Sequence, residues 1–185
     1  MTRSTGLRAV LLLMLCLSGT ARAQSTWSSF AHVEVHGTLL NGAPGAPLLD
    51  INSGWAVRGG VRRGGWGSFL QVEQSLWRGT EYGAHMVPGA LNLGIGSELR
   101  FANGLVRSSL TLGPSLLLFD TQLDKAGHLG VFLDARPLGL RWRLSPHFTL
   151  GVDPLSFAIV APVLSGIPLV RVQYRTTLLM EFDFP

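Results

Sequence analysis

Two histidines and a glutamate at alternate positions are the first residues whose types suggest chemistry. His32, Glu34 and His36 share one face if the segment is extended, because side chains two positions apart point to the same side of a strand. A His-x-His pair on a strand can present two imidazoles to one metal ion, and the carboxylate can ligate the ion or orient a ring. No third ligand follows at a fixed spacing. We therefore assign no metal, and His32 and His36 stay a candidate pair only.

Nucleophilic catalysis needs a hydroxyl or thiol with a base beside it. The chain contains Ser75, Ser109, Ser115 and several histidines, but no spacing marks a serine and a histidine as partners. The single cysteine, Cys16, lies in an apolar run near the N-terminus. We therefore assign no catalytic residue and no cofactor.

The largest set of chemically capable residues consists of arginines and carboxylates at alternate positions of extended segments. We expect these charges to face one interior and to form ion pairs there, because an unpaired charge in a narrow space is costly. Two interpretations stay open: an interior filled to hold the shape of the wall, and a gated or ligand-binding interior. The predicted network comprises Glu34, Arg58, Glu73, Glu98, Arg100, Arg107, Asp134, Arg136, Asp153, Arg171, Arg175 and Glu181.

The element that must position these groups is clearest at the C-terminus, in residues 169–184. Apolar or uncharged side chains occupy every second position from Val170 to Phe184, and the charges of Arg171, Arg175 and Glu181 lie between them. A period of two over this length predicts a β-strand with two chemically different faces.

The same alternation recurs along the chain, which predicts an all-β fold. The connections between the segments alternate between long and short, as in an antiparallel up-and-down barrel with short turns at one end. We predict an eight-stranded transmembrane β-barrel with a polar lumen and both termini at the short-turn end. The expected strands are 27–40, 55–62, 66–77, 89–101, 105–119, 127–144, 148–160 and 169–184.

Aromatic residues and glycines favour an apolar exterior. Amphipathic aromatic rings prefer the two membrane interfaces, where the strand ends of a spanning barrel lie. Glycines such as Gly94, Gly96 and Gly113 share the polar face, as the narrow interior of eight strands requires. A soluble lipocalin-like barrel with the apolar face inside stays an alternative. The predicted aromatic girdle comprises Trp27, Trp55, Trp66, Trp77, Trp142, Phe182 and Phe184.

Three prolines lie inside expected strands: Pro114, Pro137 and Pro154. Proline removes a hydrogen bond from the ladder, and a closed barrel has no edge strand to accommodate it, so we predict wall bulges at these positions. The apolar phase shifts after Pro137 and around Pro154, which supports this expectation. Such bulges either add curvature or weaken the wall enough to admit a lipid chain sideways.

The first 23 residues have the pattern of an export signal. Arg3 and Arg8 precede a short apolar run, and Ala21-Arg22-Ala23 ends it, so we expect cleavage before Gln24 and a barrel domain over 24–185. Removal of three basic residues leaves a net charge of about +1 from the fifteen basic and eleven acidic residues. The high isoelectric point is then no sign of nucleic-acid binding.

The C-terminal strand resembles the assembly signal of bacterial outer-membrane barrels, an alternating strand that closes on an aromatic residue. Phe184 takes that place, with Phe182 and Tyr174 behind it, and Pro185 departs from the pattern. Over the mature chain the architecture resembles small eight-stranded barrels of the OmpA/OmpX type. The resemblance implies a monomer in the outer membrane, with membrane lipid and the barrel-assembly machinery as partners.

Two families of barrel enzymes offer a contrast. The strand prolines are similar to a feature of outer-membrane palmitoyltransferases, whereas the closely spaced histidine and serine of the lipid A deacylases are not matched here. We therefore expect a non-enzymatic outer-membrane barrel with a structural, surface-contact or limited ligand-binding role. A lipid-modifying barrel enzyme and a soluble periplasmic binding barrel are the alternatives.

Overall fold

The computed structural model describes residues 27–42, 52–76, 89–118, 128–164 and 167–184, and these ranges are almost entirely β-strand. The expected signal peptide, its cleavage site and Trp77 lie outside the described residues. The elements are β1 (Trp27–Gly42), β2 (Asn52–Arg63), β3 (Trp66–Leu76), β4 (Gly89–Phe101), the 3-10 turn η1 (Ala102–Gly104), β5 (Val106–Leu117), β6 (His128–Ser145), β7 (Phe148–Leu164), β8 (Ile167–Pro168) and β9 (Arg171–Phe184).

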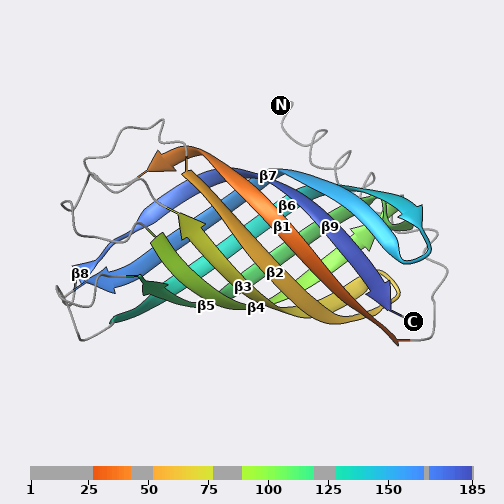
Figure 1. Cartoon of the computed structure of the whole chain (residues 1–185), viewed down its shortest axis with the longest axis horizontal. Coiled ribbons are helices and arrows are strands. Elements are labelled where there is room, and N and C mark those ends of the chain that lie inside the picture. The colour runs from red at the N-terminus through yellow and green to blue at the C-terminus, as the bar shows by residue number, and fades with distance from the viewer. Residues whose placement is uncertain (1–26, 43–51, 77–88, 119–127, 165–166, 185) are drawn as a thin grey trace, which may run out of the picture.

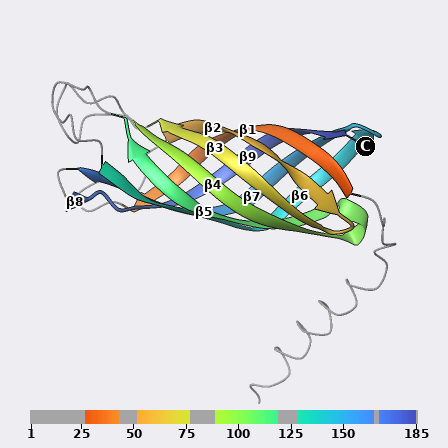
Figure 2. The same ribbon diagram turned by 90° about the horizontal axis from the view of Figure 1, so that it is seen from below.

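The strands close into an eight-stranded antiparallel up-and-down barrel, as predicted (Figure 1). Consecutive strands from β1 to β7 pair with one another, and β9 pairs with both β7 and β1. The two-residue β8 pairs only with β7 and forms no wall strand of its own. The turns β2–β3, β4–β5 and β6–β7 lie at the end where β1 begins and β9 ends, which we call the short-turn end (Figure 2).

The two faces of each strand differ as the alternation predicted. In β9, Val172 and Leu178 point outward and are 50% and 58% exposed, whereas Arg171 and Arg175 point inward and are 2% and 0% exposed. The barrel interior, here called the lumen, is therefore polar, and the exterior is apolar. An interior filled by the apolar face, as in a lipocalin-like barrel, is not the arrangement observed.

Several strands extend beyond their expected bounds. β7 continues to Leu164, four residues past the prediction, and its last two residues, Val163 and Leu164, pair with β8. β2 begins at Asn52, within a segment expected to be loop. In contrast, β4 has the predicted bounds, since an Asn-Gly turn follows it directly and Asn103 adopts a positive φ of 57°.

The prolines affect the wall in two different ways. Pro137 lies in a register shift between Ala135 and Leu138, and Pro154 lies in one between Asp153 and Ser156. Pro114 causes no bulge, contrary to expectation, because the register of β5 stays constant through it against both neighbouring strands.

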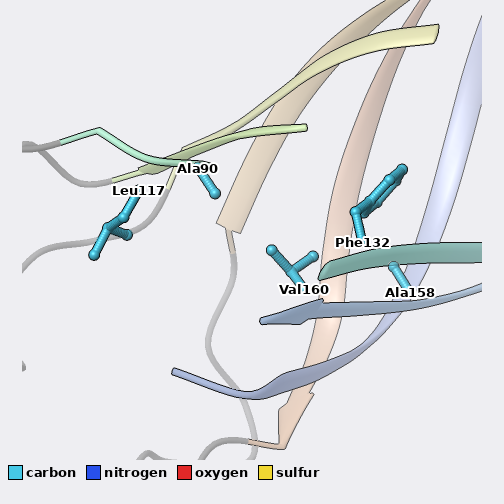
Figure 3. Packing of buried hydrophobic residues seen from close by; sticks show 5 residues of the cluster. All are labelled: Ala90, Leu117, Phe132, Ala158 and Val160. Carbon is cyan, nitrogen blue, oxygen red and sulfur yellow. The ribbon is translucent and has the colours of Figure 1, made fainter. Parts of the chain in front are cut away.

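A layer of buried apolar side chains lies in the lumen near the end opposite the short turns (Figure 3). Phe132 and Val160 are fully buried there, and Leu169 packs against the layer. The layer comprises Ala90, Leu117, Phe132, Ala158 and Val160. Most of the lumen charges thus lie between this layer and the short-turn end, whereas Arg171 is level with the layer, because it pairs directly with Val160. Within the described residues, no helix is long and apolar enough to span a membrane.

Candidate functional site: the charged lumen

The predicted charges all face the lumen. Eleven of the twelve are at most 2% exposed, and Arg100, the twelfth, is partly buried near the short-turn end. Arg62, Arg141 and Asp183 join them, so eight arginines and seven carboxylates share the interior. This near balance of charge fits a lumen in which ion pairs offset the cost of burial.

The middle of the lumen is occupied by a group centred on Arg136. Its Nη1 and Nη2 donate to the two carboxylate oxygens of Glu34 at 2.8 and 2.6 Å, which is bidentate geometry. Its Nε donates to Asp134 at 2.8 Å and its Nη1 to Asp153 at 3.1 Å. Arg58 adds a further contact of 3.3 Å to Asp134. One guanidinium from β6 thereby fixes carboxylates of β1, β6 and β7.

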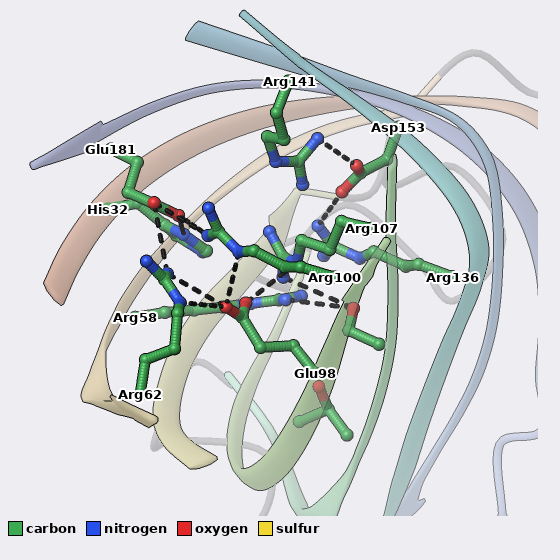
Figure 4. Close-up of polar contacts among 12 residues, drawn as sticks. His32, Arg58, Arg62, Glu98, Arg100, Arg107, Arg136, Arg141, Asp153 and Glu181 are labelled. Carbon is green, nitrogen blue, oxygen red and sulfur yellow. Dashed lines mark hydrogen bonds and ion pairs between the residues drawn. The ribbon is translucent and has the colours of Figure 1, made fainter. Parts of the chain in front are cut away.

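A second group lies nearer the short-turn end (Figure 4). Arg62 donates to Glu98, Glu181 and Asp183 at 3.0, 3.2 and 2.8 Å. Arg100 donates to Glu98 at 3.0 Å and to Glu181 at 2.7 Å. β2, β4 and β9 are thus joined across the lumen, although none of the three is paired with another in the sheet.

A third group surrounds Glu73 on the other side of the middle group. Arg175 reaches Glu73 at 2.8 Å, and Gln71, Ser75 and Asn92 donate to the same carboxylate at 2.9 to 3.0 Å. The neutral members of this group were absent from the predicted network. These neutral residues lie at the same alternate strand positions as the charged residues, and this pattern could have identified them from the sequence.

Two phenylalanines that were absent from the predicted interior also point into the lumen. Phe30 and Phe69 are 2% and 3% exposed. The guanidinium carbon of Arg62 lies 4.4 Å from the centre of the Phe30 ring, and that of Arg58 lies 4.6 Å from the Phe69 ring. These cation–π contacts stabilise the arginines while removing water from around them.

The structure places the two candidate metal ligands beside different carboxylates. His32 lies 3.4 Å from Glu34 and 3.5 Å from Glu181, whereas His36 lies 3.9 Å from Glu73. Among the described residues, no group of three or more histidines, cysteines or carboxylates is arranged to hold a metal ion. The imidazoles instead belong to two separate groups of the polar network.

The described residues of the predicted aromatic girdle are exposed on the outer wall. Five of them lie at the short-turn end, and Trp55 lies towards the opposite end, where its indole Nε1 donates to Gln74 at 3.1 Å. This bond explains why a glutamine interrupts the apolar face of β3. The exposed girdle residues are Trp27, Trp55, Trp66, Trp142, Phe182 and Phe184.

Side chains from the outer face compensate for the register shifts at Pro137 and Pro154. Ser108 donates to the carbonyl oxygen of Pro137 at 2.6 Å, and Tyr174 donates to that of Pro154 at 2.8 Å. A carbonyl without a partner would be costly in an apolar medium. The bulges therefore do not leave these two carbonyls unpaired.

These features define the class: an eight-stranded up-and-down barrel with an apolar exterior and a lumen filled by charge. No family model and no curated protein matches the chain. Among solved structures, Neisserial surface protein A shares the fold with a TM-score of 0.57 at 11% identity, over 86% of this chain and 97% of that one. Ail, the attachment invasion locus protein of Yersinia pestis, shares it with a TM-score of 0.52 at 16% identity, over 87% and 100%.

A second structure of Ail, in complex with the heparin analogue sucrose octasulfate, has a TM-score of 0.51 at 17% identity, over 85% of this chain and 98% of that one. At such identities the likeness concerns the fold. It supports the eight-stranded outer-membrane barrel architecture that the strand order already indicates.

Proposed function

We propose that this protein is a non-enzymatic barrel of the outer membrane, monomeric and surrounded by lipid, whose closed lumen makes it a structural component of the envelope. The observation that carries the proposal is the direction of the side chains. Large apolar residues such as Leu70, Ile95 and Leu129 are 64 to 67% exposed, while fully buried arginines fill the interior. Water is a poor solvent for such an exterior, and the hydrocarbon of a bilayer is a good one.

The ion pairs support a lumen that does not conduct. Arg136–Glu34, Arg175–Glu73 and Arg62–Glu181 each join strands that are not neighbours in the sheet, and so they cross the interior. An eight-stranded interior is just wide enough for side chains to fill it. A barrel closed in this way can anchor its connecting segments at the membrane surface, which suits a role in surface contact.

Reconstitution into a planar bilayer tests the closed lumen. The proposal predicts no large stable conductance from protein whose folded state is verified by a heat-dependent gel shift. Steady open-channel currents would contradict it. Mass spectrometry of lipid A from cells with and without the protein separates the proposal from a lipid-modifying enzyme, for which the lipid would change in mass.

A further inference from the structure

The short-turn end of the barrel contains a cavity of about 1120 Å³ that the function proposed above does not use. Its polar lining includes four arginines. Arg62, Arg100, Arg141 and Arg143 line it, with Asp183 as the carboxylate among the lining residues. The oxygen Oδ1 of Asp183 already accepts a hydrogen bond of 2.8 Å from Arg62. Arg62 and Arg100 are already paired with Glu98 and Glu181, so the positive charge that can attract an anion comes mainly from Arg141 and Arg143.

Arg141 is the most deeply buried of these arginines, with its side chain 1% exposed. One side of its guanidinium is anchored: Nη1 lies 2.7 Å from Asp153 and donates to the carbonyl of Leu140 at 2.8 Å (Figure 4). The other two nitrogens, Nε and Nη2, have no hydrogen-bond partner among the described residues. A buried charged donor without a partner is costly, so this edge is suited to a ligand that accepts hydrogen bonds.

The backbone around Arg141 is shaped to hold it in place. A Cβ atom built on Gly151 would lie 2.7 Å from both Cδ and Nη1 of Arg141, and one on Gly139 would lie 3.0 Å from Nη1. The guanidinium thus lies against two glycines, on β7 and β6, that leave room for it. Its unpaired edge is consequently fixed in direction before any ligand arrives, which lowers the entropic cost of binding.

Arg143 supplies a second fixed cation at the rim. Its Nε donates to the carbonyl of Ser145 at 3.2 Å and its Nη2 to that of Pro146 at 2.6 Å. Apolar side chains of Trp27, Trp142 and Phe184 also line the cavity. An anion held between the buried and the exposed arginine would therefore lie beside an apolar rim.

We propose that this cavity is an anion-binding site for a phosphate group, with the Nε–Nη2 edge of Arg141 as the principal donor and Arg143 as the second. Arginine binds phosphate oxygens through two parallel N–H donors, a geometry that the free edge of Arg141 offers. The phosphate group can belong to a soluble molecule or to a lipid headgroup at the rim. The chemistry of recognition is the same in both cases.

Calorimetric titration of the folded full-length barrel with inorganic phosphate tests the site, in a maltoside detergent that contains no phosphate. We expect saturable binding. Arg141→Lys keeps the positive charge but loses the two parallel N–H donors, and it should weaken binding about tenfold, equivalent to about 1.4 kcal/mol. Arg143→Gln removes an exposed cation without touching the buried network, and we expect it to weaken binding as well. Arg63→Gln is the matched control, because Arg63 is exposed at the same end but does not line the cavity.

Absence of saturable binding by the unaltered barrel up to roughly 10 mM phosphate would overturn the proposal. Equal weakening by Arg63→Gln and Arg143→Gln would also overturn it, since diffuse attraction would then explain the binding. Nanodiscs distinguish the two sources of phosphate. Weaker binding in discs that contain phosphatidic acid than in discs that contain an equal amount of a fatty acid, which carries negative charge without phosphate, identifies a lipid headgroup as the occupant, and equal binding identifies a soluble one.

Discussion

Arg136 and Glu34 form a bidentate ion pair across the lumen, with both nitrogen–oxygen distances at or below 2.8 Å. They lie on β6 and β1, which are not paired in the sheet, and both side chains are at most 2% exposed. The pair therefore links β1 and β6 across the lumen.

Removal of one charge from this pair should destabilise the barrel strongly. Glu34→Gln removes one of three carboxylates from the buried Arg136, and Asp134 and Asp153 remain, so the loss should be about 1.5–3 kcal/mol. Urea unfolding in lipid vesicles, followed by tryptophan fluorescence, measures the change in the free energy of unfolding. Asp183→Asn is the matched control, because that side chain is 20% exposed at the mouth and its loss should cost less than about 1 kcal/mol. Equal losses of unfolding free energy in the two variants would contradict the stabilising role of the Arg136–Glu34 pair.

The hydroxyl groups that donate to the carbonyl oxygens of Pro137 and Pro154 give a second prediction. Tyr174→Phe removes the donor to Pro154, and Ser108→Ala removes the donor to Pro137. Each variant should lose about 1–3 kcal/mol, because the carbonyl then lacks a partner in an apolar medium. Amide hydrogen exchange should increase around the altered bulge and stay unchanged at the other. Ser97→Ala changes an exposed serine of β4 and should have little effect; a loss as large as that of the other two would argue against the carbonyl bonds.

Close approach of β4 and β5 at Gly113 gives a third prediction. A Cβ there would lie 2.0 Å from the carbonyl oxygen of Leu93 and 2.9 Å from the Cα of Gly94, both backbone atoms that cannot turn aside. Gly113→Ala should therefore reduce the folded fraction seen in a heat-dependent gel shift. Gly37→Ala meets nothing within 4 Å and should be neutral or stabilise the strand by about 0.5–1 kcal/mol. Comparable folding of both variants would contradict this packing.

The alternation of side chains predicted most of the fold. It separated the faces of every strand, because a period of two fixes which residues share a side. Pro114 shows where the pattern was insufficient. The constant register around it shows that a missing N–H in a strand does not always require an extra residue. The extension of β7 to Leu164 was also missed: the expected strand ended at residue 160, although Pro162 lies within the observed strand.

The composition of the lumen was predictable, but its pairing was not. Every predicted charge faces inward. Which arginine pairs with which carboxylate depends on the tilt and stagger of the strands, and these cannot be determined from the sequence of one strand. His32 and His36 illustrate the limit. Both share the inner face of β1, and only the neighbouring strands decide that one meets Glu181 and the other meets Glu73.

The central claim is that the apolar exterior contacts lipid while the polar face is enclosed, and accessibility along β9 tests it most directly. The one cysteine of the chain, Cys16, precedes the expected cleavage site, so single cysteines can be introduced into the barrel for spin labelling. In lipid vesicles, labels at Val172, Leu178 and Met180 should be reached by dissolved oxygen and shielded from a water-soluble nickel complex. Labels at Gln173 and Thr177 should be shielded from oxygen. The opposite phase, or access of the nickel complex to the outward positions, would contradict the account.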